Sequence, residues 1–129
     1  MYAPIIVFAY NRPKHLEKTL TALSKNAEAK ESMLFIFIDG PKDIKDSAMN
    51  KQVYLRAKQF EYGYFKNVTI IKSKKNQGLA RAVINGVTEI ISQYNKVIVT
   101  EDDAVCASSY LKFMNEALEY YENNPLVWS

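Results

Sequence analysis

The sequence contains few of the residues on which disulfide-bonded and zinc-binding domains depend. Its 129 residues include one cysteine, Cys106, and one histidine, His15. A single cysteine excludes a disulfide bond within the chain and suits a reducing compartment. One histidine and one cysteine are too few for a zinc site of the usual ligand types. The chain is long enough for one domain with a hydrophobic core, which must then supply the stability.

Long apolar segments and strong charge are also missing. The longest apolar runs are too short to cross a bilayer, and the N-terminus lacks the basic start and cleavage site of a signal peptide. The formal net charge is only +3, which permits binding of an anionic small molecule and gives no sign of a nucleic-acid surface. We therefore expect a cytoplasmic protein with no transmembrane segment and no nucleic-acid partner. A peripheral place at the inner face of a membrane stays open for the full-length protein.

Several common ligand-binding motifs are absent as well. No G-x-G-x-x-G dinucleotide motif follows the first apolar run, and the chain has no G-x-x-x-x-G-K-[ST] phosphate loop. It also has no G-x-S-x-G nucleophile elbow. Tyr10 and Asn11 stand where a receiver domain would have paired acids and a sugar-phosphate nucleotidylyltransferase would have a glycine-rich loop. These absences argue against each of these classes of α/β protein.

The chain instead alternates short apolar runs with amphipathic segments. The apolar runs predict four strands and the start of a fifth, at residues 4–9, 33–38, 68–71, 96–100 and 126–128. Apolar residues at helical spacing predict helices at about 13–25, 46–61, 78–93 and 108–122. Such alternation requires a mostly parallel sheet with helices on both faces. The predicted fold class is therefore α/β and Rossmann-like.

The predicted helices carry specific expectations about capping and packing. Asp46 and Ser47 are expected to cap the second helix, with Met49 on its buried face. In the third helix, Leu79 and Ile91 belong to a broad apolar stripe that should face the sheet. Gly86 lies within that stripe and costs helix stability, so it is expected to mark close packing of the helix on the sheet.

The strongest candidate site is the acidic triplet Glu101-Asp102-Asp103, which directly follows a β-branched apolar run. Carboxylates so close together repel one another, and charges at a strand end need a partner. A divalent cation is the natural partner because it prefers oxygen ligands and is often shared with substrate phosphates. The triplet is therefore a candidate metal-phosphate site, and a solvated acidic turn is the alternative.

Other polar groups are expected to lie beside the triplet. Ligands of open parallel sheets bind beyond the carboxyl ends of the strands. In this chain that edge would gather residues 10–12, 39–40, 72–76 and 101–103. These segments contain both carboxylates and cations, which favours a ligand with its own anionic groups together with a metal ion.

Four segments of the chain resemble a known family: PIIVFAYNRPKHLEKTL, FIFIDGPKD, KNQGLARAVINGVTEII and the stretch from KVIVTEDD to the last residue. They are similar to GT-A glycosyltransferases of the family 2 type, above all to bacterial sugar transferases with a Glu-Asp-Asp motif. The animal N-acetylglucosaminyltransferase I group has the same signature. The likeness covers all 129 residues, which correspond to the nucleotide-sugar-binding, N-terminal half of the GT-A fold.

This resemblance implies a function. Such an enzyme transfers a sugar from a nucleotide-diphosphate donor, here expected to carry UDP, to a glycan or lipid-linked acceptor, as in polysaccharide biosynthesis. Mn²⁺ or Mg²⁺ would stabilise the diphosphate leaving group, and a carboxylate base would activate the acceptor hydroxyl with inversion of the anomeric centre. A non-catalytic domain of the same fold, which binds a nucleotide or a protein partner, is the alternative.

The resemblance also implies roles for particular residues. Asp39 would accept a hydrogen bond from the uracil or ribose, and Arg12 would meet the nucleotide or its phosphates. Asp103 would bind the metal ion, with Asp102 closer to the ribose or donor sugar and Arg81 near the diphosphate or sugar. The implied donor-binding residues are Ala9, Tyr10, Asn11, Arg12, Asp39, Gly78, Arg81, Glu101 and Asp102.

The general base is not among these residues, and we expect it, with most of the acceptor site, beyond Ser129. Residues 1–129 would then be a truncated domain that could be inactive alone. An exposed apolar edge, where the missing half should pack, would favour self-association.

Overall fold

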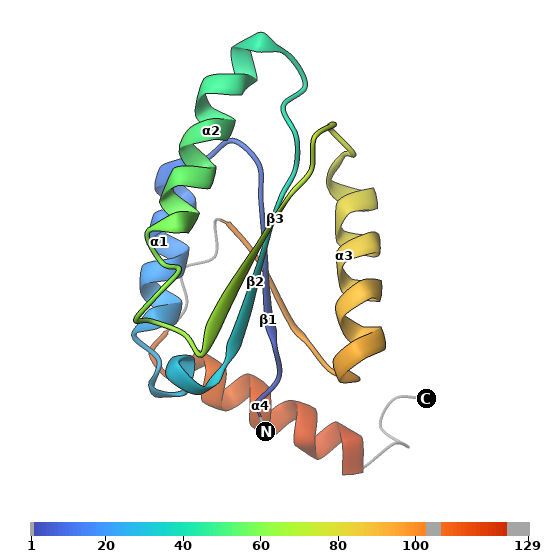
Figure 1. Cartoon of the computed structure of the whole chain (residues 1–129). Helices are drawn as coiled ribbons and strands as arrows, with labels where there is room; N and C mark the ends of the chain where they lie inside the picture. Colours follow the sequence, from blue (N-terminus) through green and yellow to red (C-terminus); the bar gives the residue numbers. More distant parts are fainter. Residues whose placement is uncertain (1, 103–106, 124–129) are drawn as a thin grey trace.

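The computed structural model describes residues 2–102 and 107–123 (Figure 1). The strands are β1 (Ile5–Ala9), β2 (Met33–Ile38), β3 (Asn67–Lys72) and β4 (Ile98–Glu101). The helices are α1 (Pro13–Ser24), α2 (Ile44–Lys58), α3 (Leu79–Tyr94) and α4 (Tyr110–Asn123), with a short 3₁₀ helix, η1 (Ala27–Glu31). The elements occur in the predicted order, while the fifth strand expected at 126–128 lies outside the described residues.

The four strands form one parallel sheet in the order β3-β2-β1-β4. β1 lies between β2 and β4, and all five of its residues are buried. Ala9 pairs with Ile38, Ile38 pairs with Lys72, and Phe8 pairs with Glu101, so the carboxyl ends of the strands meet at one edge. The predicted α/β class with a parallel sheet is confirmed.

The order of the strands explains why helices cover both faces. From β1 to β3 the chain moves in one direction along the sheet, and it then returns past β2 and β1 to form β4. Because parallel crossovers are right-handed, a reversal of direction puts the connecting helix on the opposite face. Accordingly, α1 and α2 lie on one side of the sheet and α3 on the other (Figure 1).

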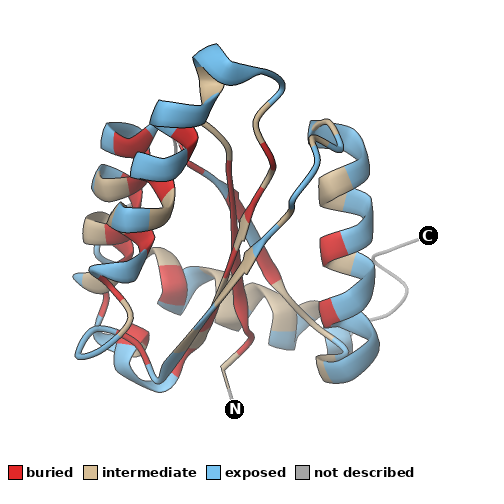
Figure 2. Cartoon of the chain, turned by 45° about the horizontal axis from the view of Figure 1, so that its top comes forward, coloured by how far each residue is buried: buried red, intermediate tan, exposed pale blue. Residues whose placement is uncertain are grey.

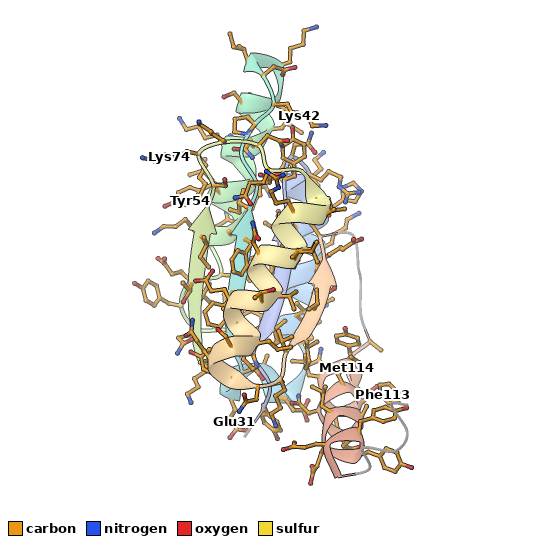
Figure 3. The ribbon with its side chains drawn as sticks, turned by 90° about the vertical axis from the view of Figure 1, so that its right-hand side faces the viewer. Glu31, Lys42, Tyr54, Lys74, Phe113 and Met114 are labelled. Atoms are coloured by element: carbon orange, nitrogen blue, oxygen red, sulfur yellow. The ribbon has the colours of Figure 1, made fainter. Side chains whose placement is uncertain are left out.

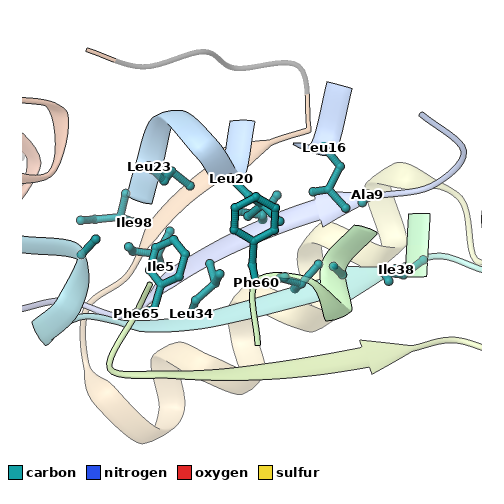
Figure 4. Packing of buried hydrophobic residues seen from close by; sticks show 14 of the residues in the cluster. Ile5, Ala9, Leu16, Leu20, Leu23, Leu34, Ile38, Phe60, Phe65 and Ile98 are labelled. Atoms are coloured by element: carbon teal, nitrogen blue, oxygen red, sulfur yellow. The ribbon is translucent and has the colours of Figure 1, made fainter. Parts of the chain in front are cut away.

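The larger core lies between the sheet and the helices α1 and α2. Figure 2 shows buried residues along the strands and on the inner sides of the helices. The cluster includes Ile5, Val7, Leu16, Leu20, Leu23, Leu34, Ile36, Val53, Ala57 and Ile98 (Figure 4). Each of the valine, leucine and isoleucine side chains contributes about 1.5–3 kcal/mol when fully buried. This burial fixes α1 and α2 against the strands.

A smaller core lies under α3, where the helix approaches the sheet closely. Ile6, Phe8 and Ile90 are buried there. The ring centroids of Phe8 and Phe37 lie 5.5 Å apart. A Cβ atom on Gly86 would lie only 2.9 Å from Cε1 of Phe8. The expectation that Gly86 marks close packing on the sheet is confirmed.

Helix α4 lies at the opposite end of the sheet from the strands' carboxyl ends, beside the N-terminus (Figure 1). The backbone N–H of Leu111 donates to Oδ1 of Asn26 at 2.9 Å, and the side chain of Asn115 accepts from the N–H of Ala3 at 2.8 Å. Leu111 is fully buried. Among the described helices, none combines the length and the hydrophobicity that a membrane span requires.

The predicted cap of α2 was wrong. The helix begins at Ile44, and the N-cap is Asp43, whose side chain accepts from the backbone N–H of Asp46 at 3.0 Å. Asp43 offers the same capping chemistry one turn earlier, so Asp46 lies inside the first turn. The predicted buried face was also wrong at one position: Met49 is 49% exposed, and the neighbouring Asn50 is buried instead.

Part of the α3–β4 region is less buried than the sequence predicted. Leu79, the first residue of α3, is 61% exposed, and Ile91, in its last turn, is 42% exposed. Val99 is 39% exposed, since β4 lies at the edge of the described sheet and only alternate residues of it face a core. The apolar stripe of α3 is therefore broader than the surface that the sheet can cover.

Replacement of Gly86 by alanine tests the close approach of α3. Alanine favours a helix by about 1 kcal/mol, whereas overpacking costs about 1–3 kcal/mol. Because the methyl group would meet the packed ring of Phe8, we expect a net loss of about 1 kcal/mol on denaturant unfolding, and a larger loss for Gly86→Val. Thr88→Ala, on the exposed side of the same helix, should change stability by less than about 0.5 kcal/mol. A Gly86→Ala protein more stable than the parent would contradict the close contact.

Candidate functional site

A cavity of about 350 Å³ opens at the carboxyl edge of the sheet. It lies where the strand order reverses between β1 and β4, the position at which open α/β sheets bind ligands. Figure 3 shows Lys42 and Lys74 at this end of the molecule and Glu31 at the other. The lining residues are Phe8, Ala9, Tyr10, Asn11, Arg12, Phe37, Asp39, Lys42, Asn76, Gly78, Leu79, Ala82, Glu101 and Asp102.

The lining combines two kinds of surface. The apolar part comes from Phe8, Phe37, Leu79 and Ala82, on β1, β2 and the first turns of α3. The polar part comes from the segments that follow β1, β2 and β4 and from the segment that precedes α3. An apolar surface with a few charged and hydrogen-bonding groups is typical of a small-molecule site.

The structure brings together most of the residues that the sequence nominated. Eight of the nine predicted donor-binding residues line the cavity: Ala9, Tyr10, Asn11, Arg12, Asp39, Gly78, Glu101 and Asp102. Arg81 does not line it; this exposed residue borders a shallow hollow with Ile84 and Asn85 on α3. Asp103, the predicted metal ligand, lies outside the described residues.

Sequence reasoning missed six lining residues. Phe8, Phe37, Leu79 and Ala82 were counted as core, although the first two come just before the ends of their strands. Asn76 belongs to a segment, residues 72–76, that is expected at this edge without a role, whereas Lys42 lies just beyond the expected segment 39–40. The two phenylalanines could have been identified from the register of a parallel sheet. Residues near the ends of neighbouring strands that point to the same face lie at the same edge of the sheet.

Arg12 and Asp102 form an ion pair at the cavity. Nη2 of Arg12 lies 2.5 Å from Oδ1 of Asp102, whose side chain is only 4% exposed. The hydroxyl of Thr19 on α1 donates to the backbone oxygen of Asp102 at 2.8 Å. The middle carboxylate of the acidic triplet is therefore buried and paired with a cation. The alternative of a solvated acidic turn does not apply to Asp102.

The carboxylate of Asp39 accepts four hydrogen bonds. Oδ1 accepts from the backbone N–H groups of Gly40 and Gln77, both at 2.8 Å. Oδ2 accepts from the N–H of Gly78 at 3.0 Å and from Nδ2 of Asn76 at 3.2 Å. These bonds hold the segment before α3 against the end of β2.

Polar side chains of helix α2 form hydrogen bonds with the segments that follow β1 and β2. The buried side chain of Asn50 donates to the backbone oxygens of Tyr10, at 2.8 Å, and Asp39, at 2.7 Å. One turn earlier, the carboxylate of Asp46 accepts from Nδ2 of Asn11 at 2.9 Å and from the N–H of Lys42 at 3.3 Å. These polar residues position the two segments that line the cavity after β1 and β2.

The described carboxylates do not by themselves complete a metal site. Within residues 2–102 and 107–123, no three histidine, cysteine, aspartate or glutamate side chains converge in a group that could hold an ion. Asp102 is engaged by Arg12, while Glu101 is exposed at the end of β4. An ion at this edge would therefore need further oxygen ligands, for which Asp103 and the phosphates of a ligand are the candidates.

Arg12→Ala tests the ion pair. Removal of the guanidinium leaves a buried carboxylate short of a charged donor, which should lower the free energy of unfolding by about 1–3 kcal/mol. The side chain of Arg12 makes no capping bond to α1, so the loss would come from Asp102 and not from the helix end. Lys14→Ala, an exposed cation two residues away, should change stability by less than about 0.5 kcal/mol. Equal melting temperatures for the two variants would contradict a stabilising pair.

Comparisons with known proteins agree with this geometry. The sequence model described as "Glycosyl transferase family 2" matches residues 5–125. The fold resembles the crystal structure of S. aureus TarS, with a TM-score of 0.65 and 17% identity over 95% of this chain and 20% of that chain. It also resembles S. aureus TarS 1-349 in complex with UDP, with a TM-score of 0.60 and 19% identity over 95% of this chain and 32% of that chain.

At these identities the structural likeness supports the fold alone, and this chain spans about a fifth to a third of the TarS chains. The search of curated proteins gives no match. The family model, by contrast, covers nearly the whole sequence. The chain belongs to glycosyl transferase family 2.

Proposed function

We propose that this chain is the donor-binding part of an enzyme that transfers a sugar from a UDP-linked donor to a hydroxyl group of a glycan or lipid-linked acceptor. One observation carries the proposal: eight of the nine donor-binding residues nominated from the sequence line a single cavity in a family 2 chain. The UDP in the complex of the similar TarS structure supports the choice of nucleotide.

The cavity has the size and lining that such a donor requires. Its volume of about 350 Å³ lies within the range of small-molecule sites, roughly 300–1,000 Å³. The uracil ring would rest against the apolar part of the lining, near Phe37 and Leu79. The cations Arg12 and Lys42, which also border the cavity, would attract the diphosphate.

The chemistry that we propose places a divalent ion at the end of β4. Asp103 would hold Mn²⁺ or Mg²⁺, together with phosphate oxygens of the donor and the nearby carboxylate of Glu101. A bound ion supplies positive charge that stabilises the diphosphate as it leaves. The pair formed by Arg12 and Asp102 keeps the guanidinium beside the cavity. The base that activates the acceptor, with inversion at the sugar, would lie beyond Ser129.

Asp103→Ala tests the role of the metal. We expect calorimetric titration of the parent protein to show UDP binding that depends on Mn²⁺, and the variant to lose that dependence. Removal of one acid from a crowded cluster relieves repulsion, so the melting temperature without metal should be equal or slightly higher.

Glu119→Ala, which removes an exposed carboxylate from α4, is the control and should leave UDP binding unchanged. An Asp103→Ala protein that melts lower but binds UDP and Mn²⁺ like the parent would place the ion elsewhere. If the parent protein bound the nucleotide equally well without metal, the result would favour the alternative function, a non-catalytic domain of the same fold.

We also propose that residues 1–129 form the donor half of a larger domain. The chain spans a small part of the TarS chains, which supports this division. Exposed apolar side chains also support it: Val99 is 39% exposed on β4, at the edge of the described sheet, and Ile84 is 64% exposed on α3. Edge strands with apolar neighbours tend to pair with further strands.

The isolated chain should therefore self-associate through β4. Sedimentation velocity at increasing concentration is expected to show reversible oligomers, and Val99→Lys should shift the distribution toward monomer because a charge disfavours edge pairing. Leu55→Lys, which changes a 44% exposed residue on α2, should leave the oligomers in place. A parent protein that stays monomeric at high concentration would argue against an exposed pairing edge.

A further inference from the structure

The backbone pairing of β1 and β2 comes to its end beside the cavity. The N–H of Asp39 donates to the backbone oxygen of Ala9 at 3.0 Å, one residue beyond the end of β2. Two residues later, Pro41 has no N–H with which to continue the ladder. The backbone oxygens of Tyr10 and Asp39 therefore need donors from outside the sheet.

One buried side chain supplies both donors. Nδ2 of Asn50 donates to the oxygen of Tyr10 at 2.8 Å and to the oxygen of Asp39 at 2.7 Å, and Asn50 is only 2% exposed. A primary amide carries two N–H groups on one nitrogen, so a single atom can reach one oxygen on each segment. A hydroxyl group has one such donor, and an ionised carboxylate has none. The residue type therefore fits this position for a chemical reason.

Asp46, one turn earlier in α2, joins the same two segments as an acceptor. Its carboxylate accepts from Nδ2 of Asn11, after β1, at 2.9 Å and from the N–H of Lys42, after β2, at 3.3 Å. Residues four apart lie on one face of a helix, so a single face of α2 carries both bridges. Asp46 is half-buried and its bonds are longer, which makes Asn50 the firmer bridge.

The helix that carries these bridges is itself fixed on the sheet. Val53 and Ala57 of α2 are fully buried in the larger core. Tyr10 and Asp39, which receive the bonds of Asn50, line the cavity, whereas Asn50 lies behind them and does not line it. Any effect of Asn50 on a ligand must therefore act through these two segments.

We propose that Asn50 is a positioning residue for the donor: its two bonds fix the separation of the segments after β1 and β2, between which the nucleoside enters. The proposal rests on the donor-binding function proposed above. It agrees with the contact to uracil or ribose expected of Asp39, because Asn50 holds the backbone from which that carboxylate projects. A preset separation spares the ligand the cost of ordering both segments.

Amide hydrogen exchange tests the bridge without any nucleotide. In Asn50→Ala two backbone oxygens lose their donor, so exchange at the N–H of Asp39 should accelerate roughly tenfold through local opening of the ladder end. Val53→Ala, which removes buried methyl groups from the same helix, should accelerate exchange at the core residue Ile36 and leave Asp39 unchanged. Exchange at Asp39 that is unchanged in Asn50→Ala, or accelerated equally by both variants, would overturn the proposal.

Titration with UDP tests the effect on the ligand. Each variant is measured well below its melting temperature, so that all the protein is folded. Asn50→Ala should raise the dissociation constant about tenfold, because the ligand must then order the two segments itself. Val53→Ala should melt lower than the parent and yet bind UDP like the parent, which separates positioning from a loss of stability alone. An Asn50→Ala protein with the parent's dissociation constant would overturn the proposal.

Two milder variants keep the proposal testable if Asn50→Ala fails to fold. Asn50→Ser keeps one donor group, and Asp46→Ala removes only the half-buried bridge. Both should raise the dissociation constant for UDP by a smaller factor, and parent-like binding in both would overturn the proposal. If the parent itself does not bind UDP, the function proposed above fails, and exchange at Asp39 still decides whether Asn50 holds the two segments.

Discussion

β1 lies at the centre of the parallel sheet, and its position constrains most of the remaining structure. It is buried along its whole length and pairs with β2 on one side and β4 on the other. Because the crossovers are right-handed, the return of the chain from β3 to β4 puts α3 on the face opposite α1 and α2. The reversal also leaves an opening beyond the ends of β1 and β4, and the cavity lies there.

The polar residues around this opening mainly bind one another. Asn50 of α2 bonds the backbone of both Tyr10 and Asp39, and Arg12 pairs with Asp102 across the cavity edge. These contacts fix the backbone segments before any ligand arrives, which lowers the ordering cost of binding. A polar residue at such an edge can therefore serve a ligand by shaping the site, and not only by touching the ligand.

The sequence predicted the strands well because each is a short apolar run bounded by polar residues, and it located the site because parallel strands end at one edge. It could not predict contacts that depend on residues far apart in the chain. In the sequence, Asn50 looks like a surface residue. Only the fold brings the backbone oxygens of Tyr10 and Asp39 beside it. The exposure of Val99 depends on which strand lies at the edge, a matter of topology and not of the local pattern.

The central claim is that the cavity at the β1–β4 reversal receives a uridine nucleotide, and an amide NMR titration of the parent protein with UDP and Mg²⁺ tests it most directly. The account predicts saturable shift changes at Tyr10, Asn11 and Gly78, with little change at Thr21 and Ala22, which line a separate hollow on α1. Saturable changes centred on α1 with none at the cavity, or no saturable change anywhere, would contradict it.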